Sequence, residues 1–187
     1  LLQQCYNVAD TLIVGRFVGT NALAAVGSSY SLMTFLTSIL LGLCMGSGAL
    51  FSMHFGRRDP DGLRESLVSS FALIAVVAVV LNILSFACLD WIQVFLQVPD
   101  EVWGLMRQYL AIIFTGIPAI FLYNYFASFL RAVGNSVVPL AFLAVSACLN
   151  IVLDLYFVLG LGRSVGGAAE ATVISQYVSG IGILIYT

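Results

Sequence analysis

The sequence predicts an all-α membrane protein whose transmembrane helices form one six-helix bundle. The main observation is the length of the uncharged runs. The 24 residues between Glu65 and Asp90 carry no charge, and a helix needs about 20 apolar residues to cross the bilayer hydrocarbon. Further runs of 40, 23 and 22 uncharged residues occupy positions 17–56, 108–130 and 132–153. The composition agrees, because 61% of residues are hydrophobic and 9% are charged, against about 25% charged in soluble domains.

The polar, glycine and proline residues between these runs mark where each predicted helix ends and the next begins. Asp59 and Pro60 suit the start of the third helix. The half-polar connector 90–101, with its aromatic residues, is predicted to be an interfacial turn anchored at the membrane surface. The predicted helices span about residues 1–17, 22–55, 63–89, 102–133 and 137–159, and a sixth begins near residue 168.

Both ends of the chain lie in apolar sequence. The chain starts on Leu1 without an initiator Met, and it stops within the apolar run 181–187. We therefore interpret both ends as cuts through helices, so that residues 1–187 are expected to be one lobe of a longer polypeptide. No basic start followed by a cleavage site is present, so no signal peptide is expected.

The charged residues and cysteines exclude several function classes. The net charge is −2, and no basic stripe is available for nucleic acid. The four cysteines lie far apart in apolar runs without a C-x-x-C pair, which favours small buried side chains over disulfides or a thiolate metal site.

The arginines indicate an orientation. Loops after the second and fourth helices hold four of them, and the opposite side holds three. The excess predicts that the first set faces the cytoplasm. The two sets are Arg57, Arg58, Arg64 and Arg131, and Arg16, Arg107 and Arg163.

Two acidic residues, Asp10 and Asp154, interrupt the apolar runs. A carboxylate deep in lipid costs about 2.5–3.5 kcal/mol, so it must face a partner or a wet cavity, or hold a proton. Asn150 precedes Asp154 by four residues, and Tyr6 precedes Asp10 by four, so each pair shares one helix face. These four side chains meet in one cavity if the first and fifth helices are neighbours. The alternatives are ordinary interhelical hydrogen bonds, or a position of Asp10 close enough to a helix end to be hydrated.

The chemistry of such a cavity allows two occupants. If Asp10 and Asp154 approach each other, one of them is expected to hold a proton near neutral pH, because desolvation and like charge both disfavour two carboxylates. Alternatively, a small hard cation replaces that proton. Carboxylate, amide and hydroxyl oxygens suit Na⁺ or H₃O⁺ and do not suit Zn²⁺.

Other polar or small residues carry weaker expectations. Asn124 either joins the same pocket or makes an interhelical hydrogen bond. Gly42 and Gly46 form a G-x-x-x-G pattern, which predicts close helix packing. His54 is expected at the membrane interface, and Glu170 receives no role.

Five stretches together resemble the multidrug and toxic compound extrusion (MATE) family of efflux transporters. The first two, residues 6–16 (YNVADTLIVGR) and 22–27 (ALAAVG), are similar to that family's first helix and first turn. Residues 130–135 (LRAVGN) and 149–154 (LNIVLD) are similar to its fourth and fifth helices, and residues 167–176 (GAAEATVISQ) to its sixth.

This resemblance implies a fold and an activity. Family members have twelve helices in two six-helix lobes, so the chain resembles the amino-terminal lobe, and the second lobe would be its partner. They lie in the cell membrane, export organic and often cationic compounds in exchange for H⁺ or Na⁺, and are not enzymes. No cofactor beyond this coupling ion is implied.

The resemblance also implies roles for single residues. Asp10 would take up the proton or cation, with partners from the fifth helix and the sixth, so that a Na⁺ site would consist of Asp10, Asn150, Asp154 and Thr172. Tyr6 and Asn124 would line the same cavity. The chain lacks the proline that some members carry near the start of the first helix, and it has Glu170 where a small or apolar residue is expected.

Two other functions are compatible with parts of the pattern. A flippase for lipid-linked oligosaccharides, from a related branch, would need cationic residues in its cavity, and no Arg lies mid-helix. An intramembrane aspartyl protease would need Tyr directly before one Asp and G-x-G-D around the other. Here Tyr6 lies four residues before Asp10, and the sequence after Gly160 continues Leu-Gly-Arg.

Overall fold

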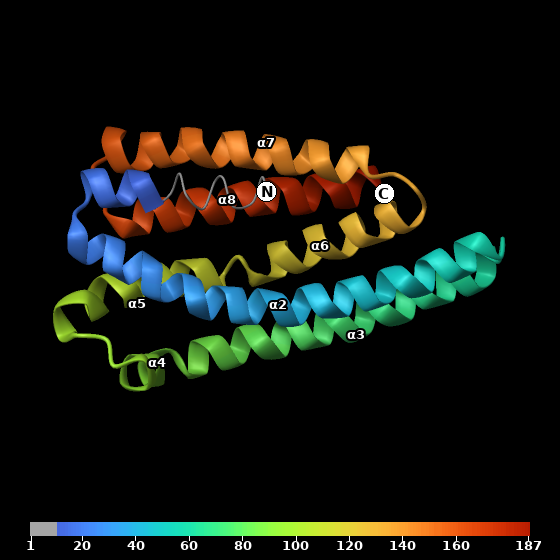
Figure 1. The fold of residues 1–187 in the computed structure, drawn as a ribbon, viewed down its shortest axis with the longest axis horizontal. Helices are drawn as coiled ribbons and strands as arrows, with labels where there is room; N and C mark the ends of the chain where they lie inside the picture. The colour runs from blue at the N-terminus through green and yellow to red at the C-terminus, as the bar shows by residue number, and fades with distance from the viewer. Residues whose placement is uncertain (1–10) are drawn as a thin grey trace.

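The computed structural model describes residues 11–187, except for the side chains of Phe95 and Leu96. It is an elongated bundle of roughly antiparallel helices (Figure 1). Residues 11–17 are helical and precede the labelled elements. These are α2 (Thr20–Gly56), α3 (Pro60–Ala87), α4 (Leu89–Leu96), α5 (Asp100–Phe114), α6 (Ile117–Ala132), α7 (Val137–Asp154), the π-helix η1 (Leu155–Gly160) and α8 (Val165–Tyr186).

The predicted all-α membrane fold is confirmed. Four helical stretches in the described part are long and apolar enough to cross a membrane, and the bent pair α5–α6 makes a fifth. The first predicted helix lies mostly outside the described residues, so the count of six stays a prediction.

The interior of the bundle is formed by α2, α6 and α8. α2 packs against α3, α5 and α6, while α8 packs against α5, α6 and α7, and α3 and α7 lie on opposite flanks (Figure 1). α3 is buried at only three positions, Ile74, Ala78 and Ser85. Leu67 and Phe71 are partly buried and pack against the core, whereas many other apolar side chains of α3, such as Leu73 and Val76, are exposed, as expected for a helix with one face toward lipid.

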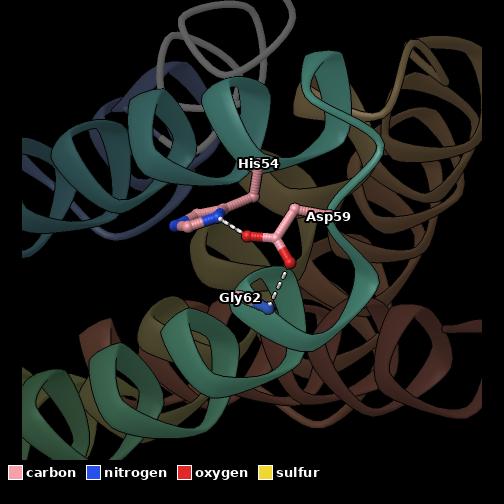
Figure 2. A network of polar contacts seen from close by, with 3 residues as sticks. All are labelled: His54, Asp59 and Gly62. Atoms are coloured by element: carbon pink, nitrogen blue, oxygen red, sulfur yellow. Dashed lines mark hydrogen bonds and ion pairs between the residues drawn. The ribbon is translucent and has the colours of Figure 1, made fainter.

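The α2–α3 turn forms at the predicted position and is capped by Asp59. Asp59 Oδ1 accepts a hydrogen bond from the Gly62 N–H at 3.0 Å, and Pro60 occupies the first turn of α3, where a missing N–H costs nothing. Asp59 Oδ2 lies 2.9 Å from His54 Nδ1 (Figure 2). The Gly62 hydrogen bond and then the His54 contact hold the pKa of Asp59 below its ordinary value.

Three predicted boundaries are wrong. The connector 90–101 was predicted to be a turn, but it contains α4, whose Asp90 is 3.1 Å from Arg107 Nε on α5. The loop predicted for 160–167 is shorter, because α8 begins at Val165. The helix predicted over 102–133 is broken at Thr115–Gly116, and its halves α5 and α6 are bent by 45°.

The described residues do not confirm the close packing predicted for the glycine pattern. Gly42 and Gly46 face open space in the described structure, with no atom within 4 Å of an added Cβ. Close packing occurs instead on α8. A Cβ on Gly180 would lie 2.9 Å from the Ala119 carbonyl oxygen of α6, so Gly180 allows the two backbones to approach.

The helix turns alternate between the two ends of the bundle. The α2–α3 and α6–α7 turns lie at one end, and the turn at 18–19, α4 and the η1–α8 loop lie at the other (Figure 1). The two predicted sets of arginines therefore lie toward opposite ends of the bundle. Which end faces the cytoplasm remains a prediction.

Gly180→Ala should destabilise the bundle, because the new methyl group would force α6 and α8 apart. Overpacking of this kind costs about 1–3 kcal/mol. Thermal unfolding of the full-length protein in detergent should show a lower Tm for Gly180→Ala than for the matched Gly42→Ala. Equal Tm values for both variants would contradict the close α6–α8 contact.

Asp59→Ala should lower the Tm at neutral pH. Asp61→Ala, two residues further on in the first turn of α3, should change the Tm less. Because the folded-state pKa of Asp59 lies below 3.8, its carboxylate stabilises the folded protein above that pH, and this contribution is lost as pH falls through the folded-state pKa. The Tm difference between wild type and Asp59→Ala should therefore shrink in acid. A difference that persists unchanged below that pKa would show that the charge is not responsible.

Candidate functional site

One face of α7 is polar and fully buried. Ser146, Asn150 and Asp154 follow one another at intervals of four residues, and their exposed fractions are 6%, 1% and 0%. Ser146 Oγ donates to the Ser175 carbonyl of α8 at 2.9 Å. The predicted common face of Asn150 and Asp154 is therefore present, and it is turned toward α8.

Asn150 and Thr172 connect α7 to α8 through a hydrogen bond whose direction is fixed. The Thr172 hydroxyl donates to the Ala168 carbonyl at 3.0 Å, because a carbonyl can only accept. Its oxygen accordingly accepts from Asn150 Nδ2 at 3.3 Å. Asn150 Oδ1 has no hydrogen-bond partner among the described residues. A buried acceptor oxygen is thus available to a donor or a cation.

The backbone changes its winding directly after Asp154. α7 ends at Asp154 and continues as the π-helix η1, in which the Leu161 N–H donates to the Tyr156 carbonyl five residues back. Short π-helical segments often occur at functional sites, because the extra residue per turn shifts the facing of the side chains. Here Asp154 is buried while Leu155 and Tyr156 are exposed.

A polar cavity of about 210 Å³ lies between α2, α5, α6, α7 and α8. Thr172 lines it, as does the predicted Asn124, whose Nδ2 donates to the Ile120 carbonyl of its own helix. None of the described residues that line it is charged. The other polar lining residues are Tyr30, Thr34, Thr37, Ser38, Tyr109, Tyr123, Ser146, Gln176 and Ser179.

These additional lining residues were missed from the sequence. The signal was the same helical spacing that singled out Asn150 and Asp154. Residues 30, 34 and 38 of α2 are Tyr, Thr and Ser, and residues 172, 176 and 179 of α8 are Thr, Gln and Ser. Each set occupies one helix face.

The remaining predicted residues do not extend the described site. Tyr6 and Asp10 lie outside the described residues, so their approach to Asp154 stays a prediction. Glu170 accepts a hydrogen bond from Arg163 Nη1 in the η1–α8 region, which gives it a structural role. No group of three or more His, Cys, Asp or Glu side chains gathers within residues 11–187.

Asn150 and Asp154 are not among the residues that line the cavity, although Thr172, the partner of Asn150, is. The arrangement defines a class: a polytopic membrane protein with an uncharged polar cavity between its helices and a buried carboxyl group on one of these helices. The MatE family matches residues 1–156, which is most of the chain. The chain therefore belongs to the MatE family of multidrug and toxic compound extrusion transporters. Members of this family are multi-pass cell-membrane transporters and not enzymes.

Curated relatives agree with this assignment. The chain is 30% identical over 175 residues to the probable multidrug resistance protein YpnP of Bacillus subtilis, which covers 94% of the chain and 39% of the relative. It is 29% identical over 194 residues to the multidrug export protein MepA of Staphylococcus aureus, covering 100% and 41%. The chain thus spans about two fifths of the length of these relatives.

A solved structure gives the same picture. The outward-facing conformation of a multidrug resistance MATE family transporter of the MOP superfamily superposes with a TM-score of 0.92 at 28% identity. The superposition covers 99% of this chain and 41% of that one. These matches give no support to the flippase or protease alternatives.

Thr172→Val should destabilise the protein, because it leaves the buried Asn150 Nδ2 without its acceptor. An unsatisfied buried donor costs about 1–3 kcal/mol. Thr172→Ser keeps the oxygen and should retain most of the stability. Thr34→Val is the matched control, since the Thr34 hydroxyl also lines the cavity but donates to the Tyr30 carbonyl of its own helix. Tm measurements should rank Thr172→Val lowest, and equal values for Val and Ser at position 172 would contradict the bridge.

Proposed function

We propose that the full-length protein is a secondary antiporter that exports organic, often cationic, compounds in exchange for H⁺ or Na⁺. The coupling ion binds at Asp154, with Asn150, Thr172 and Asp10 as further oxygen donors. A second lobe, which the greater length of the relatives suggests, completes the transporter. The coupling ion is the only cofactor in this proposal.

The observation that carries the proposal is the burial of Asp154 beside Asn150. Asp154 is 0% exposed, and the adjacent turn of α7 carries Asn150 with its unsatisfied Oδ1. Burying an ionised carboxylate in this way is expensive, so a residue of this kind usually serves a function. A proton on Asp154, or Na⁺ held by these oxygens together with the Thr172 hydroxyl, would neutralise that charge.

The cavity supports an organic substrate with some positive charge. Its lining contains Tyr30, Tyr109 and Tyr123, whose rings attract cations, and its uncharged polar groups accept hydrogen bonds. Its volume of about 210 Å³ is below the roughly 300–1,000 Å³ of typical small-molecule sites. The second lobe would therefore supply the rest of the substrate site.

The exchange follows from competition for one charge. With Asp154 ionised, the carboxylate attracts a cationic substrate to the neighbouring cavity. When H⁺ or Na⁺ neutralises it, this attraction is lost, the packing of the first helix changes, and the substrate leaves outward. Entry of the coupling ion supplies about 2.3 kcal/mol per charge per 100 mV, plus its concentration gradient.

Dye efflux from proteoliposomes tests the proposal. Full-length wild type should expel ethidium when an inward H⁺ gradient or an inward Na⁺ gradient is imposed. The gradient that drives efflux identifies the coupling ion. Asp154→Asn and Asp10→Asn should each reduce efflux to the background level, because they remove the charge that the ion neutralises. Asp90→Asn, in the exposed pair with Arg107, should leave efflux intact.

The decisive combination is the double variant. If the full-length protein carrying both Asp10→Asn and Asp154→Asn still expels ethidium against its gradient, the proposed ion exchange is wrong.

A further inference from the structure

The break between α5 and α6 has a specific backbone cause. In a continuous helix, the N–H of residue 118 would bond to the Phe114 carbonyl, but residue 118 is a proline and has no N–H. The pyrrolidine ring also collides with the carbonyl four residues back. The helix therefore bends by 45° at Thr115–Gly116, and regular bonding resumes with the Ile120 N–H donating to the Gly116 carbonyl.

This bend frees two carbonyl groups, and side chains from two other helices bond to them. Asn82 Nδ2, on α3, donates to the Phe114 carbonyl at 2.6 Å. The Tyr177 hydroxyl, on α8, donates to the Thr115 carbonyl at 2.8 Å. Since lipid offers no hydrogen bonds, neighbouring helices must satisfy such freed groups.

The break is also packed tightly against α8. A Cβ on Gly116 would lie 2.7 Å from Gln176 Oε1 and 3.2 Å from Val173 Cγ2. Gly116 therefore lets α8 approach the break closely, and Tyr177 follows Gln176 directly in sequence. Both the packing contact and the hydrogen bond at the break thus come from one turn of α8.

Both halves of the bent span contribute to the polar cavity. Tyr109 and Ile113 line it from α5, before the break, while Ile120, Tyr123 and Asn124 line it from α6, after the break. The angle at the break therefore fixes how these two groups face each other across the cavity.

We propose that Asn82 and Tyr177 are positioning residues, which hold the proline break of the fourth span at the angle that presents Tyr109 and Asn124 to the transported compound. This role rests on the proposed export function. Because Thr172 and Tyr177 lie on the same helix, a displacement of α8 on ion binding would reach the break through the Tyr177 hydroxyl.

A measurement that does not involve transport tests whether Asn82 and Tyr177 stabilise the break. Amide hydrogen–deuterium exchange of peptides covering residues 112–121 would be measured in the full-length protein in lipid nanodiscs. The amides of these peptides should exchange faster than in wild type in two variants. Tyr177→Phe removes one hydroxyl group, and Asn82→Leu removes the amide at similar size. Tyr186→Phe, at the exposed end of α8, is the matched control and should exchange like wild type.

A double variant separates this role from general packing. Pro118→Ala supplies an N–H for the Phe114 carbonyl, so the carbonyl no longer needs Asn82. Adding Asn82→Leu to Pro118→Ala should therefore change exchange less than adding it to wild type. Additive effects would overturn the assignment of Asn82 to the Phe114 carbonyl.

The positioning of the cavity is tested by efflux kinetics. Tyr177→Phe and Asn82→Leu should raise the apparent KM for ethidium about two- to tenfold, the effect of losing one hydrogen bond, with the maximal rate largely kept. Unchanged exchange in both variants, or faster exchange with an unchanged KM, would overturn the proposal. If wild type exports nothing, the proposed function fails, while the exchange results still decide whether the break is held.

Discussion

The hydrocarbon of a bilayer contains no water that could bond to a polar group, and this constraint determines most of the bundle. Hydroxyl groups bond to carbonyls of their own helix, as Ser29 does to Ala25 and Ser175 to Ala171, each at 2.7 Å. Polar groups that a helix cannot satisfy are satisfied by its neighbours. The Asn150–Thr172 bond and the two donors at the α5–α6 break are of this kind. Buried hydrogen bonds between helices therefore identify which helices pack against each other.

The same constraint distinguishes polar groups that only hold helices together from groups that point to a function. A hydroxyl or amide in the bundle is inexpensive once it has a partner, whereas a buried carboxylate remains costly. Asp154 is buried one turn of α7 away from Asn150, and Asn150 donates to Thr172, which lines a cavity whose described lining is uncharged. The proposed exchange of an ion for a cationic compound rests on this buried carboxyl group.

The sequence predicted the parts of the fold that depend on composition and spacing. Long uncharged runs located the spans, and Asp59 with Pro60 located the start of α3. The shared face of Asn150 and Asp154 followed from their interval of four residues. The break at Thr115 was not predicted, because proline is tolerated in membrane helices and its effect depends on donors such as Asn82 from distant segments. The hydroxyl groups of α2 were missed since Ser and Thr that bond to their own helix are common in membrane spans. Gly42 was expected to mediate packing, but a short glycine pattern does not specify which neighbour it faces.

The most direct test of the account is infrared difference spectroscopy of the full-length protein in lipid, on lowering the pH and on adding Na⁺. The account predicts a change in a carboxyl or carboxylate band on one of these steps, and it predicts that Asp154→Asn removes that band while Asp90→Asn preserves it. Spectra in which neither step alters any band that depends on Asp154 would contradict it.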